Sequence, residues 1–86
     1  MAYQIALTSK ALKQLKKLGK SKENLFRPIL EALAKNPRPP GATKLKGSEN
    51  EYRVRVGDYR IVYSVQDAML LVTVIKVAHR REVYRK

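Results

Sequence analysis

Cysteine is absent from this 86-residue sequence, and histidine occurs only once, as His79. Without thiol groups the chain can form no disulfide bond, no thiolate zinc site and no cysteine nucleophile. The absence of cysteine is also compatible with a reducing compartment. Of these two residue types, only His79 can therefore serve as a metal ligand or a base.

Acidic residues are few: seven Asp and Glu residues stand against 19 Lys and Arg, which gives a formal net charge of +12. Metal-dependent nucleases gather carboxylates on adjacent elements to hold their cations, whereas the carboxylates here are scattered along the chain. We therefore expect no bound metal and no cofactor. The excess positive charges repel one another in the folded state, and this excess predicts a polyanionic partner.

Long apolar segments are also lacking. The longest runs from Met69 to Val77, is interrupted by Thr73 and Lys76, and is too short to span a bilayer. The N-terminus has no signal-peptide pattern, and we find no amphipathic or lipidated membrane anchor. The sequence therefore predicts a cytoplasmic protein without membrane contact, and its length predicts one domain over residues 1–86.

The first half of the chain predicts a short strand and two helices. Residues 3–7 alternate in the manner of a strand, and Thr8 or Ser9 can cap a first helix that ends at Gly19. A second helical pattern follows at once, so the two helices should form an antiparallel pair. Pro28 lies inside this second pattern, which means that the helix either is kinked there or begins close to it.

The second half of the chain changes to the two-residue period of strands. Apolar and polar side chains alternate over residues 51–56 and 59–65, and Gly57-Asp58 between them suits a two-residue hairpin turn. Residues 69–78 are almost continuously apolar, which is typical of a strand in the centre of a covered sheet. Together the two halves predict an α+β fold: an N-terminal short strand and an antiparallel helical hairpin packed on a twisted antiparallel β-sheet.

Three arginines share one face of the predicted hairpin. The turn places Arg55 opposite Arg60, and Arg53 lies two residues along the same face. Like charges directly opposite one another destabilise a sheet by roughly 0.2–1 kcal/mol, so folding alone does not favour this arrangement. One such arginine could be an ordinary solvated charge, but the cluster as a group indicates anion binding. The tyrosines of these strands alternate with valine and isoleucine and are expected in the core: Tyr52, Tyr59 and Tyr63.

The segment after the last strand carries His79, Arg80 and Tyr84. Arginine binds phosphate oxygens bidentately and stacks on bases, and tyrosine offers a base a flat surface, so these residue types suit single-stranded RNA. RNA can be cleaved without a metal when its own 2′-hydroxyl attacks the adjacent phosphorus, which requires a base, an acid and cations. The arginines would be the cations, which leaves Tyr84 and His79 for proton transfer. Surrounding arginines would favour the phenolate form that Tyr84 needs as a base.

Three motifs together resemble the RelE branch of the RelE/ParE toxin superfamily. They are Lys44-Leu45-Lys46-Gly47, the hairpin from Tyr52 to Tyr63, and the segment from Val74 to Tyr84 that contains His79-Arg80-Arg81-Glu82-Val83. The resemblance covers nearly the whole chain and agrees with the predicted fold. It implies ribosome-dependent cleavage of mRNA in the decoding site, which inhibits translation, and neutralisation by a cognate RelB-like antitoxin that wraps the toxin. The implied partners are the antitoxin, mRNA and the ribosome with its rRNA, while operon DNA is reached only via the antitoxin complex.

The resemblance also implies site residues. The family's basic positions and late tyrosine match Arg53, Arg55, Arg60, Arg80 and Tyr84. The best-studied branch has lysines at the first two of these positions. Lysine can lose a proton and act as a base, whereas arginine cannot, so that role would pass here to Tyr84 or His79.

The fold and the basic face also fit two other functions. A ParE-like toxin shares the fold but inhibits DNA gyrase and lacks the basic cluster that is retained here. A non-catalytic RNA- or ribosome-binding module needs only the basic face, with Tyr84 stacking on a base. Inhibition of gyrase supercoiling would identify the first function, and salt-sensitive RNA binding without cleaved ends would identify the second.

Overall fold

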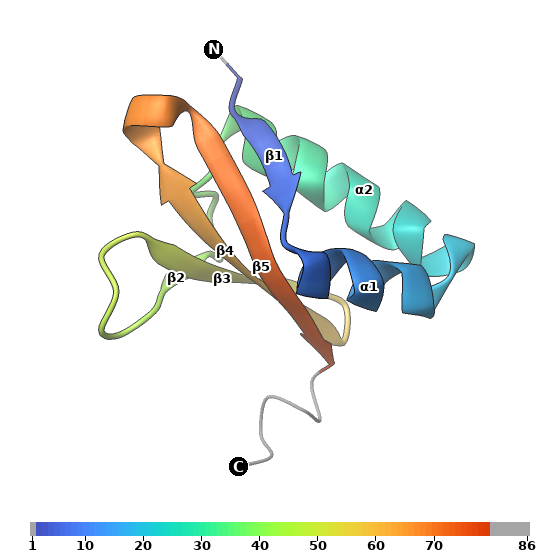
Figure 1. Cartoon of the computed structure of the whole chain (residues 1–86). Coiled ribbons are helices and arrows are strands. Elements are labelled where there is room, and N and C mark those ends of the chain that lie inside the picture. Colours follow the sequence, from blue (N-terminus) through green and yellow to red (C-terminus); the bar gives the residue numbers. More distant parts are fainter. Residues whose placement is uncertain (1, 80–86) are drawn as a thin grey trace.

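The computed structural model describes residues 2–79 (Figure 1). In chain order the elements are β1 (Gln4–Leu7), α1 (Ser9–Leu18), α2 (Lys20–Lys35), β2 (Thr43–Lys44), β3 (Glu51–Val56), β4 (Tyr59–Gln66), the 3-10 helix η1 (Asp67–Met69) and β5 (Leu71–His79). The strands form one sheet in the order β1-β5-β4-β3-β2. Both α-helices lie on the same side of this sheet, as Figure 1 shows. Neither of them has the length and apolar character that crossing a membrane requires.

The predicted α+β fold is confirmed, with a helical hairpin packed on a mainly antiparallel sheet. The sheet is mixed, however, because β1 runs parallel to β5, with Gln4 opposite Leu71. All the other strand pairs are antiparallel, as predicted. A parallel pair needs a long crossover connection, and the two helices and three strands between β1 and β5 supply it. Sequence periodicity alone carries no information on this pairing.

Two residues define the helical hairpin. Thr8 caps α1, where its Oγ1 accepts a hydrogen bond from the Ala11 amide at 3.1 Å. Gly19 is the single residue between the helices, and its φ of 88° lies in the left-handed region that favours glycine. Helix α2 then runs without interruption past Pro28. Of the two alternatives that the sequence left open, a helix that begins only near Pro28 is therefore excluded.

The hydrophobic core lies between the helices and one face of the sheet. Helix α2 contributes Phe26 and Leu33, which are almost completely buried against valines and isoleucine of β3, β4 and β5. Tyr63 is also fully buried, and its hydroxyl donates a 2.6 Å hydrogen bond to the Pro37 carbonyl. Burial raises the pKa of Tyr63 to about 12. The other two tyrosines of the hairpin pack half-buried against the same core, which confirms the sequence prediction: Tyr52 and Tyr59.

The β3–β4 hairpin has the predicted register. Arg55 lies opposite Arg60, and Val56 lies opposite Tyr59 across the turn. Gly57 opens this turn with a φ of 59°, a conformation that glycine adopts without steric cost. The last strand begins at Leu71, two residues later than the apolar pattern predicts, because η1 turns the chain between β4 and β5.

Arg38 fastens the segment between α2 and β2 to the end of the sheet. Its guanidinium donates to both carboxylate oxygens of Asp67, with donor–acceptor distances of 3.1 and 2.8 Å. It also donates to the Tyr52 hydroxyl at 2.9 Å, while the Tyr3 hydroxyl donates to Asp67 at 2.6 Å. Both charged side chains are partly exposed to solvent, so the stabilisation is modest. The hydrogen bond from Arg38, followed by that from Tyr3, lowers the pKa of Asp67 to about 2.

Acidification is expected to remove the stabilisation that the Asp67 carboxylate provides. The pKa of this group is about 2 in the folded chain and 3.8 ordinarily, so the stabilisation is complete above pH 3.8 and is lost as the pH falls through about 2. Urea unfolding should therefore show that Asp67→Asn is less stable than wild type at about pH 5, with a difference that shrinks toward pH 2. In an Arg38→Met background the effect of the same substitution should depend less on pH, because the largest cause of the lowered pKa is gone and the Tyr3 hydrogen bond remains. A wild-type advantage that stays constant down to pH 2 would contradict this assignment.

Candidate functional site

The sheet face opposite the helices carries an arginine cluster. Arg53 and Arg55 project from β3, and Arg60 projects from β4 at the position directly opposite Arg55. Together with Gly41 and Thr43, the three arginines line a cavity of about 320 Å³, here called the arginine pocket. The juxtaposition of these three side chains, predicted from the hairpin register, is therefore present in the structure.

Local structure explains how the arginine pocket is built. Val54 and Val56 are buried in the core, which fixes the intervening Arg55 on the open face. Strand β2 pairs with β3 so that Thr43 lies opposite Arg53, which brings the crossing segment alongside the cluster. The contribution of Thr43 and Gly41 to the pocket was not predicted from the sequence. Strand β2 has only two residues and no alternation of its own that could reveal its partner.

The electrostatics of the arginine pocket favour an anion. Arg60 is only 7% exposed, Arg53 is half-buried and Arg55 is exposed, so the three positive charges differ in their access to solvent. None of the residues of the described chain that line the pocket is acidic. Guanidinium groups bind phosphate oxygens through paired, charge-assisted hydrogen bonds. The arrangement can therefore hold a phosphate group and stabilise negative charge that develops on it.

His79 does not join the arginine pocket. It is the last residue of β5 and lies opposite Tyr59 of β4, whereas Ala78 is the residue opposite Arg60. The His79 and Tyr59 rings meet edge to face, with centroids 5.1 Å apart, and Tyr59 in turn contacts Phe26 of α2. These contacts place His79 on the helix-covered side of the sheet. Its predicted role in proton transfer remains a prediction, without support from this geometry.

The two other predicted site residues, Arg80 and Tyr84, lie outside the described residues. Their roles also remain predictions. Within residues 2–79, no group of three or more His, Asp and Glu side chains is placed so that it could hold a metal ion.

Lys76 is a basic residue of the open face that sequence analysis did not assign to the site. It lies opposite Val62 of β4, and Val62 lies opposite Arg53 of β3, so the three residues form a row across the sheet. Alternation from the buried Val74 would have placed Lys76 on the helix-covered side. The one available signal was a charged residue within a mostly apolar run.

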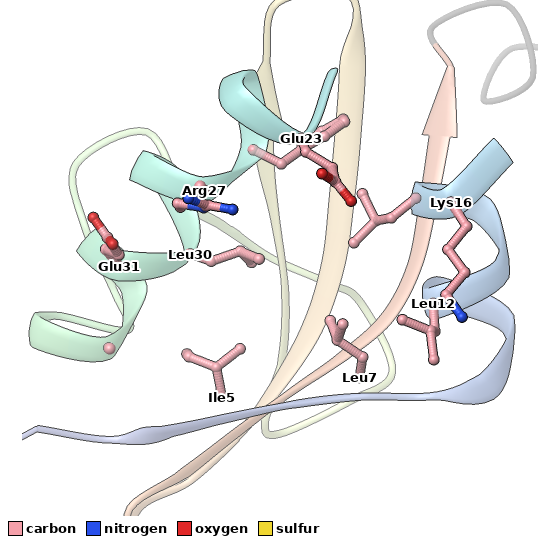
Figure 2. A pocket seen from close by; sticks show the side chains of 11 residues that line it. Ile5, Leu7, Leu12, Lys16, Glu23, Arg27, Leu30 and Glu31 are labelled. Carbon is pink, nitrogen blue, oxygen red and sulfur yellow. The ribbon is translucent and has the colours of Figure 1, made fainter. Parts of the chain in front are cut away.

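A second surface feature is an apolar groove between α1, α2 and β1 (Figure 2). Figure 2 shows Ile5, Leu7, Leu12 and Leu30 pointing into this space from three different elements. The groove has a volume of about 420 Å³ and is lined by Ile5, Leu7, Leu12, Leu15, Lys16, Glu23, Phe26, Arg27, Leu30, Glu31 and Ala34. Leu12 remains 41% exposed there. A continuous apolar surface with charged residues at its rim is typical of a protein-binding site.

Comparisons with known proteins identify relatives along almost the whole chain. Residues 5–84 match the profile of the family described as ParE toxin of type II toxin-antitoxin system, parDE. The putative toxin RelE1 of Methanocaldococcus jannaschii is 32% identical, over 99% of this chain and 98% of that protein. The mRNA interferase toxin RelE of Escherichia coli K12 is 38% identical, over 98% of this chain and 92% of that protein.

The solved structures that are similar to this chain include toxin–antitoxin complexes. The archaeal RelE–RelB complex of Pyrococcus horikoshii contains a chain that superposes with a TM-score of 0.82 and 29% identity, over 93% of this chain and 97% of that one. The intact E. coli RelBE toxin–antitoxin complex gives a TM-score of 0.79 and 31% identity, over 91% of this chain and 96% of that one.

Proposed function

Because the chain belongs to the RelE/ParE family of toxins from type II toxin–antitoxin systems, we propose that it inhibits translation by cleaving ribosome-bound mRNA in the decoding site. The observation that carries this proposal is the arginine pocket, where Arg53, Arg55 and Arg60 meet on the open sheet face. The mRNA interferase activity in the name of the E. coli relative supports the same reaction class. The ribosome and its rRNA would then be partners together with the mRNA.

The proposed reaction needs no metal ion. The 2′-hydroxyl oxygen of one nucleotide attacks the adjacent phosphorus, and a base on the protein takes its proton. The bond from phosphorus to the 5′-oxygen of the next nucleotide breaks, and an acid protonates that oxygen. The products are a 2′,3′-cyclic phosphate and a 5′-hydroxyl end. Charge builds up on the non-bridging oxygens during attack, and the guanidinium groups of the arginine pocket would stabilise it.

The roles of individual residues follow from their chemistry. Arginine stays protonated at ordinary pH, so Arg53, Arg55 and Arg60 would act as electrostatic clamps, together with Arg80. Proton transfer then requires a different side chain. The contact of His79 with Tyr59 on the helix-covered side supports assigning this step to Tyr84.

A RelB-like antitoxin is the proposed protein partner, since solved relatives of this chain are RelE–RelB complexes. We assign the apolar groove between α1, α2 and β1 to an amphipathic helix of that antitoxin. An apolar helix face would cover the exposed Leu12 side chain, and the four charged residues at the rim could pair with its polar flanks. Operon DNA would be contacted only through the toxin–antitoxin complex.

The cleavage proposal can be tested in a purified translation system with primer extension along the mRNA. Wild-type protein should cut within ribosome-occupied codons and leave 2′,3′-cyclic phosphate ends. Arg55→Met should cut roughly tenfold more slowly, because one charge-assisted contact to phosphate is lost. Lys13→Met, which removes an exposed charge from α1 on the other side of the sheet, is the matched control and should cut at the wild-type rate.

Other outcomes separate the alternative functions. Fragments that end in a 3′-hydroxyl would contradict the 2′-hydroxyl mechanism. Intact mRNA combined with inhibited gyrase supercoiling would favour a ParE-like toxin. Intact mRNA combined with salt-sensitive RNA binding would leave a non-catalytic binding module.

A further inference from the structure

Strand β5 contains one extra residue that changes which side chains face the arginine pocket. Val74 lies opposite Tyr63 of β4, and Lys76 lies opposite the preceding residue, Val62. Ile75, between them, therefore has no opposite residue in β4, which is the definition of a β-bulge.

The bulge reverses the alternation of β5. Val72 and Val74 are completely buried on the helix-covered side, and regular alternation would place Lys76 on that side too. The bulge instead puts Val77, which is 4% exposed, into the core. Lys76 is thereby moved to the open face, where it is exposed.

The side chains of Thr8, the N-cap of α1, and of Gln14, within α1, bind the backbone of β5 at the bulge. The Thr8 hydroxyl donates a 2.7 Å hydrogen bond to the carbonyl oxygen of Ile75. The Gln14 side-chain oxygen accepts a 2.7 Å hydrogen bond from the amide of Val77. A backbone carbonyl at the bulge and a backbone amide after it thus have specific side-chain partners, and Lys76 lies between these two anchored groups.

We infer that Lys76 is a further phosphate-binding residue of the RNA site, next to the phosphate held by the arginine pocket. It shares a row with Arg53 and Val62, so the Cα atoms of the two basic residues are two strand spacings apart, or ~10 Å. Flexible lysine and arginine side chains can bridge this distance to neighbouring phosphates of one strand. Positive charge then extends across the open face from β3 to β5, as expected for a groove that follows a single-stranded backbone.

This inference rests on the proposed function only in that the anion is RNA. Its test is the binding of a fluorescent, uncleavable 2′-O-methyl RNA of ~10 nucleotides to the full chain. Dissociation constants are measured between about 50 and 200 mM salt for wild type, Lys76→Met, Lys76→Arg and Lys13→Met. Lys76 and Lys13 are both exposed, so all variants should fold, which thermal unfolding will verify.

Lys76→Met should reduce the slope of log affinity against log salt concentration by about 0.7, the value for one phosphate contact on a single strand. Its affinity at the lowest salt concentration should fall roughly tenfold, as for loss of one charge-assisted contact. Lys76→Arg should retain the wild-type slope, because guanidinium also binds phosphate. Lys13→Met should match wild type.

Wild-type affinity and slope in Lys76→Met would overturn the inference and leave the proposed cleavage reaction intact. Equal losses in Lys76→Met and Lys13→Met would also overturn it, since the effect would then reflect net charge alone. If wild-type protein binds this RNA without salt dependence, the RNA-directed function and the role of Lys76 both fail.

Discussion

The variant Tyr84→Phe is expected to cleave ribosome-bound mRNA about 10²–10⁴-fold more slowly than wild type, the usual contribution of a positioned acid or base. Phenylalanine keeps the ring that could stack on a base but cannot transfer a proton. Binding to the programmed ribosome should therefore be unchanged, and single-turnover cleavage should lose the pH dependence that the ionising group imposes. Arg80→Ala is expected to lose cleavage as well, but with weaker RNA binding, because it removes a positive charge.

Two controls distinguish this role from a general effect of side-chain loss. Tyr59→Phe keeps the ring that contacts Phe26 and His79 and should remain fully active. His79→Gln should also retain most activity, because His79 contacts Tyr59 on the helix-covered side of the sheet. If a correctly folded His79→Gln variant loses as much cleavage as Tyr84→Phe, proton transfer cannot be assigned to Tyr84 alone.

The variant Leu12→Glu is expected to cleave mRNA at the wild-type rate but to resist neutralisation by the antitoxin. Leu12 is 41% exposed in the free chain, so a charged replacement should not prevent folding. In the complex, however, the carboxylate would lose its hydration against an apolar helix face. We expect the toxin–antitoxin complex to weaken by about 100-fold, the effect of losing a central interface residue. Titration of the antitoxin into the cleavage reaction would measure this directly.

Leu25 provides a matched control for the groove. It is 38% exposed on α2 but does not line the groove. Leu25→Glu should therefore be neutralised by the antitoxin as readily as wild type. Normal neutralisation of Leu12→Glu would show that the antitoxin binds elsewhere, and escape of both variants would show that any charge added to the helices is sufficient.

Local sequence signals were enough to predict that the three arginines of the hairpin share one face of the sheet. Alternation on both sides of Gly57-Asp58 fixes the register of β3 against β4, and this register alone brings Arg55 opposite Arg60. The same reasoning placed the tyrosines of these strands in the core. Such features are predictable because the residues concerned are neighbours along the chain and their pairing is set by the turn between them.

Features that depend on distant parts of the chain could not be predicted. The parallel pairing of β1 with β5 has no local signature. Around the bulge at Ile75, Thr8 donates a hydrogen bond to β5 and Gln14 accepts one from it, although both residues are more than 60 positions away along the sequence. Because one inserted residue reverses the direction of every later side chain, sequence alternation gave no indication that Lys76 belongs to the open face.

The pairing of the first strand with the last has a consequence for how the chain is made. Thr8 and Ile75, which this pairing joins by a hydrogen bond, are 67 positions apart, so the N-terminal strand has no partner until nearly all of the described chain has been synthesised. An isolated β3–β4 hairpin is at best marginally stable in water. The arginine pocket therefore also depends on the synthesis of β5 and its pairing with β4. We therefore expect the arginine pocket to be absent from the nascent chain until β5 has been synthesised and has left the ribosome.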